Sequence, residues 1–254
     1  MSIWQAILLA LVQGLTEFIP VSSSAHLVIL PYILKIPQPS LFLDVSLHLG
    51  TLLSLLVYFR QQIFELFEKG SSSRGLLKYL LVATLPAAIA GALANDFFES
   101  FFQKPLWAAV FLIFTGIFLF LAERLATFKK NSLKINYSEA LIIGLAQALA
   151  IFPGISRSGA TISAGLFLGL KREEAARFSF LLGIPIIFGS FLFELRKVSF
   201  SKTTFFPLIL GVLVSFVTGY LIIDFLLKYL KQRKLYPFAA YCFLVGLISA
   251  WWLR

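Results

Sequence analysis

Cysteine and charged residues are scarce in this sequence. The single cysteine, Cys242, lies in an apolar run, which excludes a disulfide framework and a cysteine metal site and leaves core packing as its expected role. Asp, Glu, Lys and Arg make up only 13% of the 254 residues, whereas 59% are apolar and the mean hydropathy is +0.90. This balance excludes an ordinary soluble domain. The chain is therefore predicted to be an integral membrane protein.

Acidic residues are also few, with 12 Asp and Glu against 22 Lys and Arg, which gives a net charge of +10. In a soluble protein this excess would suggest nucleic acid, but here the basic residues fall in short loops between apolar runs. Membrane topology explains them better, because cytoplasmic loops carry an excess of Lys and Arg. With the N-terminus outside, fifteen basic residues fall in cytoplasmic loops and six in outer loops, with Arg157 set aside. We expect no nucleic-acid partner.

The pattern of a cleavable leader is absent as well. Residues 3–12 form a short apolar segment that has no basic flank before it and leads into Gln13, Gly14 and Glu17 instead of an Ala-x-Ala site. We expect this segment to remain in the mature protein.

The chain is predicted to be a single membrane domain, residues 1–254, built from two internal repeats, residues 1–135 and 136–254. A shift of 134 positions lays residues 5–26 over residues 139–160 without a gap, and seven pairs are identical, including Gln13/Gln147 and Ser22/Ser156. Each repeat has two short apolar segments joined by a polar turn, followed by three longer runs. The short segments are residues 3–12, 26–34, 139–150 and 161–170, and the longer runs are residues 43–59, 77–95, 105–123, 178–195, 207–227 and 237–253.

Half-length helices joined by a polar turn are typical of re-entrant hairpins, which membranes tolerate only where protein or water surrounds them. Three crossings per repeat then make the second repeat enter from the opposite face, which is an inverted repeat. We therefore predict an all-α polytopic membrane fold in which each half is a re-entrant helical hairpin plus three transmembrane helices. Both termini are expected on the outer face, and the tips of the two hairpins are expected to meet near mid-membrane.

The first polar turn, residues 13–26 (QGLTEFIPVSSSAH), places an acid, three hydroxyls and an imidazole among apolar residues. An ionised Glu17 at this depth is costly, so it needs a partner in space, either Arg157 or a divalent metal; the alternative is an acid that reaches a helix end. Serine or histidine can attack phosphorus while its neighbour moves the proton, and the sequence does not choose between Ser23 and His26. Helix capping is the other role open to the serines. His48 is expected to be a hydrogen-bonded packing residue.

The second polar turn, residues 153–161 (PGISRSGAT), combines glycine, hydroxyls and a guanidinium with the start of a helix. Backbone N–H groups at a helix N-terminus and a planar fork of five donors suit a phosphate or diphosphate. Small residues there also permit close helix packing in lipid, but this does not explain Arg157.

These two turns resemble the signature loops of the bacterial undecaprenyl-diphosphatases of the bacitracin-resistance type, and the resemblance covers the whole chain. It implies hydrolysis of undecaprenyl diphosphate to the monophosphate, which recycles the lipid carrier for peptidoglycan and other surface polymers, with Mg²⁺ or Ca²⁺ as cofactor. Many members have a second glutamate where this chain has Gln13, so Glu17 is left as the metal ligand, with water and substrate oxygens completing the shell. The residues implied are Glu17, Ser23, His26 and Arg157 for catalysis, and Gln13, Ser22, Ser24, Gly154, Ser156 and Ser158 for substrate binding.

The same interpretation predicts a multi-pass protein of the bacterial plasma membrane whose active site is reached from the outer face. Membrane lipids and a second copy of the chain, in a homodimer, are the expected partners. The alternative is a secondary transporter or flippase for a polyprenyl phosphate or another anionic substrate, because inverted repeats with broken helices are typical of carriers. Phosphate release from a prenyl diphosphate would separate the two.

Overall fold

The computed structural model describes residues 2–68, 74–131, 134–197 and 205–254. These residues form α-helices, apart from turns and one isolated bridge between Lys130 and Leu170. The predicted all-α class is confirmed. Lys69 and Lys202, which contributed to the predicted charge asymmetry, lie outside the described residues.

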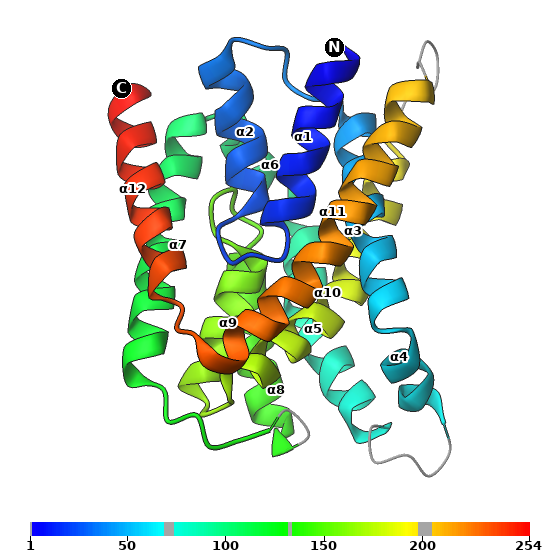
Figure 1. Cartoon of the computed structure of the whole chain (residues 1–254), viewed down its shortest axis with the longest axis vertical. Coiled ribbons are helices and arrows are strands. Elements are labelled where there is room, and N and C mark those ends of the chain that lie inside the picture. Colours follow the sequence, from blue (N-terminus) through cyan, green and yellow to red (C-terminus); the bar gives the residue numbers. More distant parts are fainter. Residues whose placement is uncertain (1, 69–73, 132–133, 198–204) are drawn as a thin grey trace.

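Two helical hairpins enter the molecule from opposite ends. Helices α1 (Ile3–Thr16) and α2 (Ser23–Leu34) run inward from the end that carries both termini, and α8 (Tyr137–Leu149) and α9 (Arg157–Phe167) run inward from the other end (Figure 1). Helix α1 is one turn longer than the predicted segment, so Gln13 is helical and Glu17 is its C-cap. The connecting turns therefore lie near the middle of the molecule.

The six predicted longer runs are all helical. Helices α3 (Leu41–Tyr58), α5 (Arg74–Leu93), α7 (Pro105–Leu125), α10 (Arg172–Leu195) and α11 (Phe205–Gln232) are long and apolar enough to cross a membrane. Helix α12 (Tyr236–Trp252) has 17 residues, which is at the short end of what can span a bilayer. The chain is a multi-pass membrane protein.

Two short helices were not predicted, namely α4 (Arg60–Phe67) and α6 (Asn95–Phe102). Helix α6 has the sequence NDFFESFF, in which polar residues interrupt the apolar ones, so no apolar run marks it. The rings of Phe98 and Phe101 pack on Phe152, which directly precedes the second turn, with centroids 4.9 and 5.2 Å apart. Helix α6 therefore covers one side of that turn.

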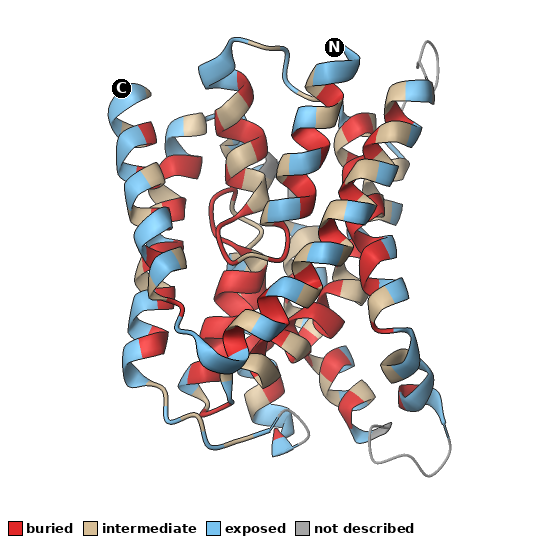
Figure 2. Ribbon diagram, in the orientation of Figure 1, coloured by how far each residue is buried: buried red, intermediate tan, exposed pale blue. Residues whose placement is uncertain are grey.

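Burial is greatest where the hairpins meet. Figure 2 shows the loop between α1 and α2 as largely buried at the centre, while the outward faces of the surrounding helices are exposed. Many of those exposed residues are Leu, Phe and Trp, as expected of helices that face lipid.

Helices α7 and α12 pack backbone to backbone through two glycines. A Cβ at Gly116 would lie 3.1 Å from the carbonyl oxygen of Ala239, and a Cβ at Gly246 would lie 3.0 Å from the carbonyl oxygen of Ala109. Both the two glycines and the two alanines are 130 positions apart in the sequence. The contact is therefore reciprocal: the same pair of positions in each half makes it.

Candidate functional site

The two polar turns contact each other between the hairpins. The Gly154 N–H donates to Ser24 Oγ at 3.3 Å, and Ser158 Oγ lies 3.5 Å from the carbonyl oxygen of Ile19. The structure thus brings together the two segments that the sequence analysis singled out.

Each turn is closed in the same way by a pair of serines. Ser22 caps α2 and Ser156 caps α9, and each side chain accepts a backbone N–H three residues on, at 3.3 and 3.0 Å. Each cap also lies 3.1 Å from a second hydroxyl, that of Ser24 or Ser158. Capping, the alternative left open for the serines of the first turn, is therefore present at Ser22, and Ser156 caps α9 in the same way.

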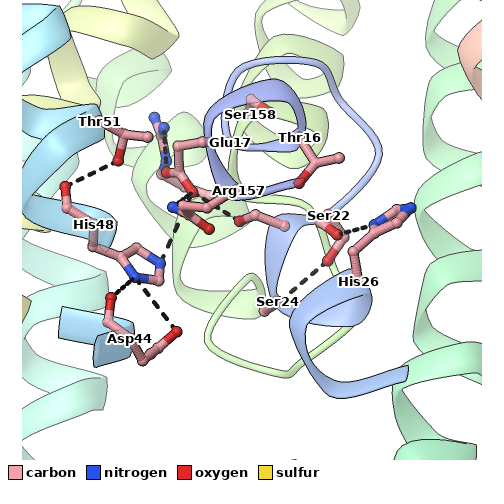
Figure 3. A network of polar contacts seen from close by, with 12 residues as sticks. Thr16, Glu17, Ser22, Ser24, His26, Asp44, His48, Thr51, Arg157 and Ser158 are labelled. Atoms are coloured by element: carbon pink, nitrogen blue, oxygen red, sulfur yellow. Dashed lines mark hydrogen bonds and ion pairs between the residues drawn. The ribbon is translucent and has the colours of Figure 1, made fainter. Parts of the chain in front are cut away.

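Glu17 is the centre of the buried polar cluster (Figure 3). Its Oε2 accepts hydrogen bonds from Ser23 Oγ at 2.7 Å and from Gln13 Nε2 at 3.0 Å, and its Oε1 accepts one from Arg157 Nη2 at 3.0 Å. The predicted partner of the carboxylate, Arg157, is thus in place. Because the Ser23 hydroxyl already donates to a carboxylate, this pair has the geometry of a nucleophile beside its base.

Arg157 is held from two sides, through its two terminal nitrogens. Its Nη1 donates to the carbonyl oxygen of Ser179 on α10 at 3.0 Å, while its Nη2 bonds to Glu17. A Cβ at Gly183 would lie 2.5 Å from Nη1, so the absence of a side chain there leaves space for the guanidinium. The Nε N–H is buried and has no hydrogen-bond partner among the residues that the structure describes. An unpaired buried donor on a cation is suited to an anionic ligand.

Thr115 was not recognised from the sequence, although it fixes the second turn. Its hydroxyl donates to the carbonyl oxygen of Gly154 and accepts the Ser156 N–H, both at 2.9 Å. Thr115 lies in the middle of α7, where a single hydroxyl in an apolar run gives no specific signal.

His26 lies away from Glu17, beyond the pair formed by Ser22 and Ser24 (Figure 3). Its Nδ1 is 2.7 Å from the carbonyl oxygen of Ser22, and its Nε2 is 2.7 Å from the hydroxyl of Tyr241 on α12. The carbonyl can only accept, so Nδ1 carries the proton, and in the neutral ring Nε2 accepts from the tyrosine. Both ring nitrogens of His26 thus contact Ser22 and Tyr241, whereas the Ser23 hydroxyl donates to Glu17, and the serine–imidazole pair stays a prediction.

A different histidine faces the carboxylate. His48 on α3 places Nε2 at 4.0 Å from Glu17 Oε2, while its Nδ1 lies 2.9 Å from the carbonyl oxygen of Asp44 and 3.8 Å from that residue's Oδ1. The predicted hydrogen bond of His48 is present, but the imidazole also faces the Glu17 carboxylate and is therefore more than a packing residue. The missed signal was that Asp44 and His48 are ionisable residues one turn apart in a membrane-spanning run.

The oxygen atoms beside Glu17 determine which metal ion could bind there. Within the described ranges, no group of three or more His, Cys, Asp or Glu gathers in a way that could hold a metal ion. The buried Oε1 of Gln13 finds no hydrogen-bond partner in the described part of the chain, and it belongs to the side chain that contacts Glu17. One carboxylate and one amide oxygen fit Mg²⁺ or Ca²⁺ only when water and phosphate oxygens complete the shell.

Comparison with known proteins gives one family. Residues 6–248 match the family described as bacitracin resistance protein BacA. The chain is 42% identical over 261 residues to a protein of Moorella thermoacetica named undecaprenyl-diphosphatase, with all of both chains covered. It is 43% identical over 263 residues to a protein of the same name from Geotalea daltonii, covering 98% of this chain and 97% of the relative. A Pelotomaculum thermopropionicum protein, again so named, is 43% identical over 254 residues, covering 97% and 95%.

Proposed function

Because the chain belongs to the bacitracin resistance protein BacA family, we propose that it is an undecaprenyl-diphosphate phosphatase. It hydrolyses undecaprenyl diphosphate to undecaprenyl phosphate and inorganic phosphate, and so recycles the lipid carrier used in cell-wall synthesis. The observation that carries the proposal is the buried cluster in which the Ser23 hydroxyl, the Glu17 carboxylate and the Arg157 guanidinium are joined by hydrogen bonds. This cluster supplies a nucleophile, a proton acceptor and charge neutralisation at one point.

In the proposed reaction, Ser23 Oγ attacks the terminal phosphorus and its proton passes to Glu17 Oε2. The bond between that phosphorus and the bridging oxygen breaks, and its electron pair leaves with undecaprenyl phosphate. Water then attacks the phosphoserine, the product phosphate departs, and Ser23 Oγ regains a proton from Glu17. The 2.7 Å contact between the two side chains supports the first proton transfer.

The role proposed for Arg157 is to hold the oxygens of the transferred phosphoryl group. Its free Nε N–H provides one donor, and its Nη2 is shared between Glu17 and the substrate. A guanidinium fixed in this way needs no rearrangement as charge develops in the transition state. Further contacts to the diphosphate are proposed for the remaining polar groups of the turns, namely Gln13, Ser22, Ser24, Gly154, Ser156 and Ser158.

Glu17 and the free Oε1 of Gln13 are the groups proposed to hold a divalent cation, Mg²⁺ or Ca²⁺. When bound, such an ion supplies charge neutralisation to the phosphate oxygens.

We further propose that the architecture is an inverted repeat with six crossings and two re-entrant hairpins in one domain. The opposite directions of the hairpins, the two termini at one end and the reciprocal glycine contacts of α7 and α12 support this reading. In the proposed setting, the bacterial plasma membrane, the termini and the entrance to the site face outward. A homodimer stays a prediction.

The test is phosphate release from undecaprenyl diphosphate by purified protein in detergent with Mg²⁺ or Ca²⁺. Wild type is expected to release phosphate, and Ser23→Ala is expected to lose about 10²-fold or more in kcat. Ser100→Ala is the matched control, because Ser100 is exposed on α6 and its hydroxyl donates to the Phe97 carbonyl oxygen of the same helix. Absence of release by wild type with every divalent cation tested would overturn the proposal and favour a carrier.

A further inference from the structure

The backbone of Ser22 is strained immediately before the proposed nucleophile. Ser22 has φ 67° and ψ 96°, in the left-handed region that residues other than glycine rarely adopt. Such a conformation persists only where surrounding contacts determine it. The orientation of the Ser23 hydroxyl toward Glu17 therefore depends on whatever holds Ser22.

His26 holds Ser22 with both its ring and its backbone. Its Nδ1 donates to the Ser22 carbonyl oxygen at 2.7 Å, and its backbone N–H lies 3.4 Å from the same oxygen. Because that carbonyl belongs to the peptide that leads into Ser23, fixing it fixes the direction in which α2 begins.

Helix α12 in turn holds His26. The Tyr241 hydroxyl lies 2.7 Å from His26 Nε2, and the two rings stack with centroids 5.7 Å apart and planes 13° apart. The next residue, Cys242, places Sγ 3.7 Å from the carbonyl oxygen of Pro20 in the same turn. Two consecutive residues of α12 thus contact the first turn, and with the proton on Nδ1 the Tyr241 hydroxyl donates to Nε2 of the neutral ring.

We propose that His26 and Tyr241 are positioning residues: Tyr241 orients the imidazole, and the imidazole holds the strained Ser22 backbone so that Ser23 faces Glu17. This inference rests on the proposed phosphatase function, and it gives His26 a role other than proton transfer.

The test compares two replacements of His26. The amide nitrogen of asparagine can occupy the place of Nδ1 and donate to the Ser22 carbonyl, but asparagine cannot act as a base. His26→Ala is expected to lower kcat by about 10²-fold, as misplacement of a reacting group by about 1 Å does. His26→Asn is expected to recover at least about tenfold of that loss, with KM changed less than about threefold in both. Equal kcat values for the two variants would overturn the proposal. They would mean that restoring the hydrogen bond to the Ser22 carbonyl does not restore activity, as expected if His26 acts as a base, because asparagine cannot accept the proton.

Tyr241 provides a second measurement that does not depend on the folding of His26 variants. Tyr241→Phe keeps the stacked ring but removes the hydroxyl, and its kcat is expected to fall by about tenfold. Tyr236→Phe on the same helix is the matched control. A kcat of Tyr241→Phe within twofold of this control would also overturn the proposal. Wild-type phosphate release, measured in parallel, shows separately whether the proposed function itself holds.

Discussion

The ion pair between Glu17 and Arg157 joins the two halves of the molecule, and its removal in one or two steps has different expected effects. Both side chains are buried, with 7% and 13% of their surfaces exposed, and Nη2 lies 3.0 Å from Oε1. Glu17→Gln leaves a buried guanidinium without its counter-charge. Arg157→Met leaves the buried Glu17 carboxylate without its counter-charge. The double variant removes both charges.

The magnitude follows from the burial. Loss of one partner of a buried pair costs about 3–5 kcal/mol, because the remaining charge is uncompensated, whereas apolar replacement of both is close to neutral. For a chain of this length, each kcal/mol changes the midpoint of thermal unfolding by about 2–4 °C. Each single variant is therefore expected to unfold roughly 6–20 °C below wild type. The double variant should unfold within roughly 4 °C of wild type. All three should be inactive.

The assay is thermal unfolding in detergent, followed by intrinsic fluorescence, with phosphate release measured on the same samples. Glu173→Gln and Arg177→Met form the control cycle, because that pair is one turn apart on α10 and partly exposed, with side chains 22% and 32% exposed. Its removal is expected to cost at most about 1 kcal/mol. If the double variant of Glu17 and Arg157 loses as much stability as the two single variants together, the charges do not compensate each other and the reasoning is wrong.

Three further predictions concern the same site and the topology. Arg157→Lys keeps the charge but loses the fork, so kcat should fall by about 10²-fold with little change in KM; the opposite pattern, a raised KM and unchanged kcat, would make Arg157 an anchor only. Gln13→Glu places a second carboxylate beside Glu17, so the protein should be destabilised without divalent cations and bind them about tenfold more tightly, measured as a calcium-dependent thermal shift; an unchanged shift would exclude Gln13 from the cation site. Ser2→Cys in a Cys242→Ser background should react with a membrane-impermeant thiol reagent in intact cells, and protection would contradict an outward N-terminus.

The meeting of the two turns was predictable because physical chemistry leaves few alternatives. A carboxylate and a guanidinium in an apolar chain must be compensated, and the duplication places Glu17 and Arg157 in equivalent turns. Helix type was predictable for the same reason, since long apolar runs in a membrane satisfy their backbone groups as helices.

The surroundings of the two histidines could not be predicted in the same way. The ring of His26 is fixed by Tyr241, which is 215 positions away, so no local spacing reveals its orientation. His48 approaches Glu17 only because α3 packs beside the first hairpin, and the sequence shows only that Asp44 shares its face. Helices α4 and α6 were missed because their short, mixed sequences contain no apolar run.

Helices α7 and α12, which pack on each other, each support the turn that belongs to the other half of the chain. Thr115 of α7, in the first half, fixes the second turn, while Tyr241 and Cys242 of α12, in the second half, contact the first turn. Each half thus supplies part of the support for the other half's turn. A unit expressed alone would carry half of a reaction centre and the scaffold for the half it lacks. With this arrangement, a mutation that separates the two halves removes from each turn part of the support that the other half supplies. Substitutions in one half are therefore constrained by the residues of the other.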